Sequence, residues 1–139
     1  MKMSASTSTD HSLSSEEFVQ LQKAVEQFNN KAFYACHETL EELWLADKSS
    51  QRDVYKGILQ IAVALFHMER NNIRGAMRLL ESGTGLIRSF EPEWSGLDTQ
   101  RLGSDSRELL NYLATGGDIH DPAVPVPTIH WVGSSLEKP

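Results

Sequence analysis

The sequence predicts an all-α fold: a single-domain bundle of about five helices with a central apolar helix, followed by an extended, proline-rich C-terminal tail. Three observations predict it. Apolar residues recur at spacings of three and four along most of the chain, as they do on one face of a helix. Capping residues and Asn or Gly turns separate these stretches. The chain has 139 residues, 40% of them hydrophobic, which suffices for one core and is short for two.

The first two helices are predicted on either side of Asn29-Asn30. Ser14 and Glu17 have the spacing of a capping box, which begins the first helix. The second helix is predicted over residues 32–46, before a polar loop over 47–51. The apolar stripes of the two helices are Phe18, Leu21, Val25 and Phe28, then Phe33, Cys36, Leu40, Leu43 and Trp44.

The third helix, predicted over residues 52–70, is apolar on nearly all sides and is therefore expected at the centre of the bundle. A fourth helix is expected over 73–90, closed by Pro92. A fifth is expected to begin at Asp98 and to stop at Gly116-Gly117.

The expected domain organisation is a disordered Ser/Thr-rich leader over 1–13, a helical bundle over 14–116 and an extended tail over 117–139. Ile129 and Trp131 are expected to dock on the bundle. The turns at Asn29-Asn30 and Asn71-Asn72, about 42 residues apart, suggest a faint internal repeat, but two copies do not make a solenoid.

Composition narrows the function classes. A net charge of −6 argues against a general nucleic-acid or anionic-membrane surface. No apolar run is long enough for a membrane span, and no secretory signal begins the chain. The single cysteine, Cys36, excludes an internal disulfide. A cytoplasmic protein is expected, with an unknown small molecule or protein as partner, a possible homodimer and an unknown cofactor.

Four residues of the second helix could carry chemistry. At 100° per residue, with Phe33 at zero, His37 lies at about 40° and belongs to the buried face. Glu41 lies on its border, Glu38 faces water, and Trp44, at about 20°, is expected in the core. His37 and Glu41, spaced i and i+4, can share a proton or a metal ion.

A polar stripe on the third helix offers partners for them: Asp53, Lys56, Gln60, His67 and Asn71. Two interpretations stay open. The stripe is either the solvent-facing edge of an apolar helix, or it turns toward the second helix and closes a polar pocket. The candidate pocket residues are His37, Glu38, Glu41, Trp44, Lys56, Gln60 and His67.

Three spaced blocks carry a family resemblance: Phe33-Tyr34-x-x-His37-Glu38-x-x-Glu41-x-x-Trp44, then Lys56-Gly57-x-x-Gln60-x-Ala62-Val63-Ala64-x-x-His67, then Asn72-x-x-Gly75-Ala76. Over about residues 27–90 they resemble the domain of unknown function 309 family. The resemblance implies an all-helical fold and no established activity. Family members often have Gly-Glu where this chain has Lys31-Ala32, and Gly where it has Asn71.

The sequence supports one leading function and two alternatives. No complete catalytic constellation is present, so a ligand-binding or protein-interaction module comes first. The first alternative is a metal-assisted or acid–base enzyme, possibly a hydrolase, in which His37, Glu41 and His67 bind a metal ion or move a proton. The second is a peptide-binding scaffold of the tetratricopeptide kind.

Overall fold

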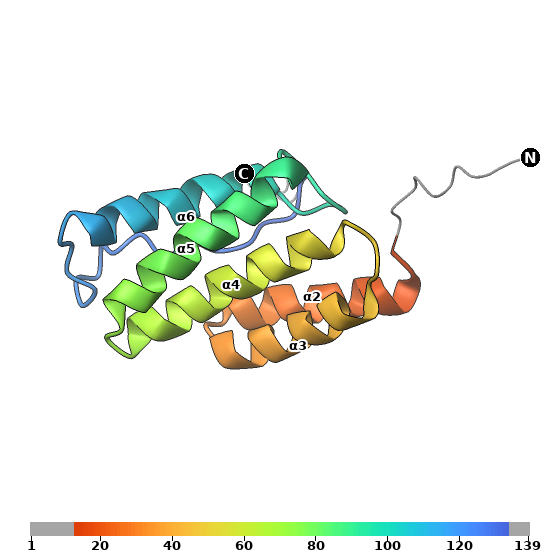
Figure 1. Cartoon of the computed structure of the whole chain (residues 1–139), viewed down its shortest axis with the longest axis horizontal. Coiled ribbons are helices and arrows are strands. Elements are labelled where there is room, and N and C mark those ends of the chain that lie inside the picture. Colours follow the sequence, from red (N-terminus) through yellow and green to blue (C-terminus); the bar gives the residue numbers. More distant parts are fainter. Residues whose placement is uncertain (1–12, 134–139) are drawn as a thin grey trace, which may run out of the picture.

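Five α-helices and one short 3₁₀ helix make up the regular structure of residues 13–133, the part of the chain that the computed structural model describes (Figure 1). The helices are α2 (Ser15–Asn29), α3 (Phe33–Ala46), α4 (Arg52–Glu69), α5 (Ile73–Ile87), η1 (Arg88–Phe90) and α6 (Thr99–Ala114). The predicted all-α fold is confirmed. Except for Leu13, the predicted leader lies outside the described residues, as does the end of the predicted tail, residues 134–139.

The helix ends follow the capping residues seen in the sequence. Ser14 Oγ accepts a hydrogen bond from Glu17 N at 3.1 Å, and Glu17 Oε1 accepts one from Ser14 N at 2.8 Å. Asp98 likewise accepts from the backbone of Arg101 at 2.9 Å. One boundary was wrong: the fourth helix is α-helical only to Ile87, and its last turn tightens into η1 before Pro92.

The hairpins α2–α3 and α4–α5 share one turn geometry. Lys31 and Asn71 both have left-handed backbone angles, with φ of 64° and 63°. The N–H of the next residue then donates to a carbonyl five positions back, Gln27 in one turn and His67 in the other, at 2.8 Å in both. The internal repeat therefore relates Lys31 to Asn71, and it has a period of 40 residues, not the 42 suggested by the asparagine pairs.

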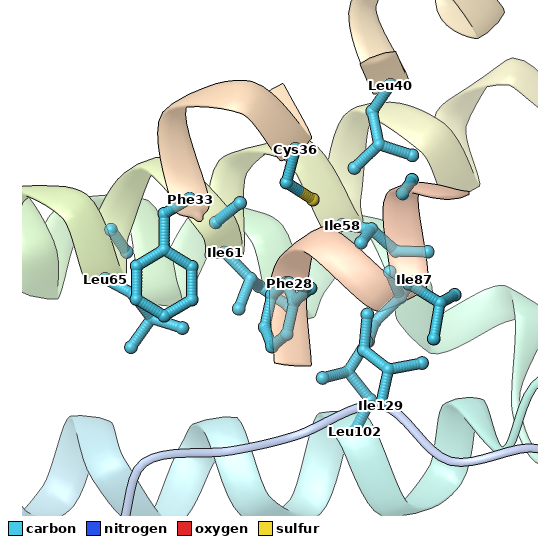
Figure 2. Close-up of a cluster of buried hydrophobic side chains, with 14 of the residues drawn as sticks. Phe28, Phe33, Cys36, Leu40, Ile58, Ile61, Leu65, Ile87, Leu102 and Ile129 are labelled. Atoms are coloured by element: carbon cyan, nitrogen blue, oxygen red, sulfur yellow. The ribbon is translucent and has the colours of Figure 1, made fainter. Parts of the chain in front are cut away.

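Helix α4 lies between α3 and α5 and contacts both, as its all-round apolar sequence predicts (Figure 1). It supplies more buried residues than any other helix described. Figure 2 shows how one cluster joins Phe28, Phe33 and Cys36 from the first hairpin to Ile61 of α4 and Ile87 of α5. None of the helices in the described range is long and apolar enough to cross a membrane.

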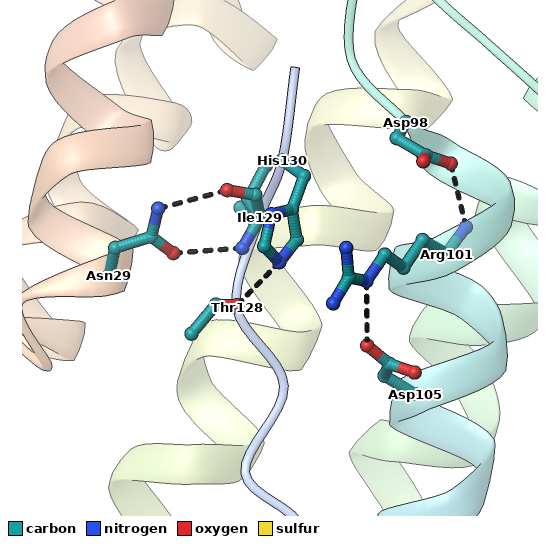
Figure 3. Close-up of polar contacts among 7 residues, drawn as sticks. All are labelled: Asn29, Asp98, Arg101, Asp105, Thr128, Ile129 and His130. Atoms are coloured by element: carbon teal, nitrogen blue, oxygen red, sulfur yellow. Dashed lines mark hydrogen bonds and ion pairs between the residues drawn. The ribbon is translucent and has the colours of Figure 1, made fainter. Parts of the chain in front are cut away.

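The C-terminal segment after α6 is extended and passes between α2 and α6 (Figure 3). Ile129 is buried in the common core near Leu102 of α6 (Figure 2). The ring of Trp131 lies 5.5 Å from that of Phe18. The side chain of Asn29 fixes the segment to α2, because it donates to Ile129 O at 2.9 Å and accepts from Ile129 N at 2.8 Å. This segment therefore holds α2 and α6 together.

Candidate functional site

The facing sides of α3 and α4 border a small open cavity of about 110 Å³, called here the polar cavity because four of its six lining residues have polar side chains. Helix α3 contributes one side because His37, Glu41 and Trp44 recur at spacings of four and three. Helix α4 contributes the other side through Lys56 and Gln60, one turn apart. The lining residues are His37, Glu41, Trp44, Lys56, Leu59 and Gln60. The cavity therefore brings together five of the seven residues that the sequence proposed for a pocket.

A larger, apolar cavity of about 210 Å³ adjoins the polar one along the same pair of helices. It is lined by Phe33, Tyr34, His37, Val63, Phe66 and His67. The ring of Tyr34 lies 5.5 Å from the imidazole of His37 and 5.7 Å from the ring of Phe66. His37 lines both cavities, and we call the two together the α3–α4 groove, with a polar end and an apolar end.

His37 and Glu41 pair across one turn of α3. The distance from His37 Nε2 to Glu41 Oε1 is 3.9 Å, and the side chains are 25% and 48% exposed. At this distance the contact is electrostatic, since a hydrogen bond requires about 2.7–3.2 Å. Glu41 thus lies close to the imidazole while its carboxylate remains open to solvent.

Two polar atoms of the groove are buried without a hydrogen-bond partner in the described part of the chain: Nδ1 of His37 and Oε1 of Gln60. A buried acceptor that lacks a donor costs on the order of 1–3 kcal/mol. Both side chains line the polar cavity. Together they leave hydrogen-bonding capacity beside the polar cavity that the fold itself does not use.

Trp44 differs from its predicted place in the core. Its side chain is only half-buried, and its ring carries the guanidinium of Arg52 at 4.3 Å and the ammonium of Lys56 at 5.7 Å. Arg52 Nε also donates to Trp44 O at 3.3 Å. Trp44 lies near the end of α3, beside the connection to α4. One face of its ring is therefore open to contact by cationic side chains.

The polar stripe of α4 is neither wholly exposed nor wholly enclosed. Asp53, Lys56 and Asn71 are exposed, whereas Gln60 and His67 are half-buried in the groove. Each of the two interpretations of the stripe is therefore right for part of it. Glu38 is exposed and is not among the described residues that line either cavity.

The candidate metal ligands do not assemble. His37 and His67 both line the apolar cavity, but Glu41 lines only the polar one. Within residues 13–133, no three His, Cys, Asp or Glu side chains are grouped so that they could hold a metal ion. The set His37, Glu41 and His67 therefore forms no ligand shell in this arrangement, since metal ligands must converge to about 2 Å from one point.

Cys36 is fully buried beside this groove, and burial raises the pKa of its thiol to about 12. The thiol is neutral near pH 7. Since the thiolate is the nucleophile, Cys36 is inert in this fold.

Several lining residues escaped the sequence analysis as site residues: Tyr34, Leu59, Val63 and Phe66. All are apolar or aromatic, and an apolar residue on an amphipathic helix gives no sign of whether a helix or a cavity covers it. Arg52 was also missed. Its spacing of eight from Trp44 crosses a loop, so no helical periodicity relates the two.

Comparison with known proteins locates a family in the same part of the chain. Residues 21–79 match the model of the family described as "Domain of unknown function (DUF309)". The chain is also 38% identical over 90 residues to the uncharacterized protein YpuF of Bacillus subtilis (strain 168), an alignment that covers 64% of this chain and 49% of that protein. The chain thus spans about half the length of this relative. No solved structure matches the chain significantly. Residues 21–79, the part of the chain that matches this family model, hold most of α2, all of α3 and α4 and the groove between them.

Proposed function

We propose that this protein is a ligand-binding module whose site is the α3–α4 groove. One observation carries the proposal: His37, which lines both cavities, and Gln60, which lines the polar one, each bury a polar atom without a partner in the described residues. Binding pockets commonly combine a mainly apolar lining with a few polar groups that orient the ligand. A ligand that paired with these atoms would remove the cost of leaving them unsatisfied.

The size of the groove limits the ligand to a small organic molecule. An apolar cavity of about 150 Å³ holds benzene, and the apolar end of the groove measures about 210 Å³. Its walls include the aromatic rings of Phe33, Tyr34 and Phe66, which suit a planar apolar group. The polar end, at about 110 Å³, has room for a substituent of a few atoms.

Titration with benzyl alcohol, followed by amide chemical shifts in NMR spectra, tests the proposal. The shifts should concentrate on the facing sides of α3 and α4. Val63 lines the apolar cavity, so Val63→Trp should fill it and abolish the shifts. Val19 on α2 is 63% exposed, and Val19→Trp serves as the matched control with binding retained. Shifts that survive in folded Val63→Trp, or no shifts at all, would contradict the proposal.

An acid–base enzyme is the second candidate, and the observation that favours it is the pair of His37 and Glu41 at 3.9 Å. In this alternative, Glu41 orients the imidazole and His37 moves a proton to or from a bound substrate. Hydrolysis of p-nitrophenyl acetate is a suitable assay. If the folded His37→Gln variant is as fast as the wild type, this candidate fails.

The scaffold of the tetratricopeptide kind finds less support. In a solenoid, each repeat contacts only its neighbours. Here residues of all five α-helices and of the C-terminal segment share one core.

A further inference from the structure

We infer that the polar end of the α3–α4 groove recognises a primary carboxamide carried on an aryl or similarly compact apolar group. This inference rests on the proposed binding function and names the ligand class. It follows from the hydrogen-bonding capacity of three side chains: His37, Gln60 and Lys56.

The pairing with Glu41 determines what His37 offers. The negative charge of Glu41 Oε1 lies 3.9 Å from Nε2, and in a neutral imidazole it favours by electrostatics the tautomer whose proton is on that nitrogen. The buried Nδ1 then carries a lone pair and no proton. Its missing partner is therefore a donor.

Gln60 also lacks a hydrogen-bond donor among the described residues. Its unpartnered buried atom is Oε1, a carbonyl oxygen, which also requires a donor. The two acceptors flank one cavity, on opposite helices. A group with two N–H bonds on one nitrogen can satisfy both, and a primary amide has such a group.

Lys56 supplies the complementary donor. Its ammonium lies on the Trp44 side of the cavity, 5.7 Å from that ring, and no acceptor in the described residues takes a hydrogen bond or ion pair from it. An ammonium has three donors and no acceptor, which suits the carbonyl oxygen of an amide. Two acceptors and one donor thus match the polar atoms of a carboxamide.

The same three groups discriminate against related ligands. A carboxylate has no proton for His37 or Gln60, and its attraction to Lys56 is opposed by the negative charge of Glu41 in the same cavity. A ketone can accept from Lys56 and leaves both acceptors unpaired. Both buried acceptors are at the ends of side chains whose last torsion is soft, so a small rotation turns them toward a ligand.

Benzamide, benzoate and acetophenone are near-isosteric probes of this specificity. Titrated into the full chain and followed by NMR, benzamide should bind at least about tenfold more tightly than either of the others. Gln60→Leu should reduce that preference severalfold. Glu38→Gln, on the exposed side of α3, is the matched control and should keep it. The imidazole ¹⁵N resonance of His37 Nδ1 should move with benzamide more than with acetophenone, a readout that needs no variant.

The outcomes separate this inference from the proposed function. If benzyl alcohol binds in the groove and the three probes bind equally, or benzoate binds best, the carboxamide assignment is overturned while the binding function stands. If neither benzyl alcohol nor any of the three probes perturbs the groove, the binding function fails and this assignment fails with it.

Discussion

Gly83 of α5 lies directly against the backbone of Gly57 in α4. A Cβ atom added to Gly83 would stand 2.8 Å from the carbonyl oxygen of Gly57 and 2.9 Å from Cγ1 of Ile61. Real Cβ atoms do not come so close, and a backbone oxygen in the middle of a helix cannot turn aside. The missing side chains at these two positions therefore let α4 and α5 approach closely.

Gly83→Ala should separate the two helices and lower the free energy of unfolding by about 1–3 kcal/mol, as overpacking of a core typically does. Gly85 is the matched control two residues along the same helix, because a Cβ there meets nothing within 4 Å. Gly85→Ala should raise stability by up to about 1 kcal/mol through helix propensity. Urea unfolding of both variants checks the pair, and equal effects would refute the close approach.

Lys31 occupies a left-handed position, with a φ of 64°, that suits glycine better than lysine. An L-residue in this conformation is strained by roughly 1–2 kcal/mol, and glycine removes the strain. Glycine also makes the unfolded chain more flexible, which cancels part of that gain in stability. Lys31→Gly should therefore raise the free energy of unfolding by about 0.5–1 kcal/mol. A thermal melt should show this as a higher melting temperature. Lys31→Ala removes the charge but keeps the Cβ, and it should bring no such gain. A gain of the same size in both variants would assign the effect to the side chain instead.

The fold could be predicted from the sequence because its turns and helix caps depend on residues that are close together in the chain. The resemblance noted in the sequence predicts glycine-like turns at Lys31 and Asn71, and both residues adopt the backbone angle that glycine favours. Ser14, Asn72 and Asp98 each accept the hydrogen bond expected of a helix cap. Each of these signals depends on residues within one helical turn, so the sequence shows it directly.

The candidate site could be predicted only in outline, because it depends on how two helices meet. Angular position along α3 predicted His37 on the buried face, Glu41 on its border and Glu38 in water; in the structure the His37 side chain is 25% exposed, that of Glu41 is 48% exposed and Glu38 is exposed. The angular position of Trp44 predicted a place in the core, but periodicity does not show that its ring, near the end of α3, contacts Arg52. Whether Gln60 would face water or the cavity that His37 also lines depended on the rotation of α4, which packs against both α3 and α5.

Stability at alkaline pH should depend on Cys36. Burial raises the pKa of its thiol from 9.0 to about 12, so above pH 9 the unfolded chain loses this proton while the folded chain retains it. The unfolded state then binds fewer protons, and stability falls as the pH rises, by about 1.4 kcal/mol per pH unit until the folded thiol also ionises.

Urea unfolding at pH 8 and pH 10.5 measures this loss, with a contribution from Cys36 on the order of 2 kcal/mol. Burial also raises the pKa of Tyr55, which adds to the loss above pH 10 in every variant. Cys36→Ala should be less stable than the wild type at pH 8 because it leaves a small cavity, yet it should lose less on going to pH 10.5. An unchanged pH dependence would mean that the thiol is accessible to water.

The attachment of the C-terminal segment should depend on Asn29. Its side-chain amide makes two hydrogen bonds to the backbone of Ile129, one as donor and one as acceptor (Figure 3). Asn29→Leu should remove both and lower the free energy of unfolding by about 1–3 kcal/mol, since it leaves an N–H and a carbonyl of a partly buried backbone unpaired. Asn30→Leu, at the neighbouring exposed position, has no such bonds to lose and is the control.

Hydrogen exchange separates local release of the segment from general loss of stability. Asn29 accepts from the amide of Ile129, whose side chain is buried next to α6, so exchange at this amide in the wild type requires the segment to lift away. In Asn29→Leu, the Ile129 amide should exchange faster by a larger factor than the amides of α4, which report global unfolding. If all amides accelerate equally, Asn29 stabilises the whole bundle and not the segment. If Ile129 exchanges no faster than in the wild type, the buried side chain alone holds the segment between α2 and α6.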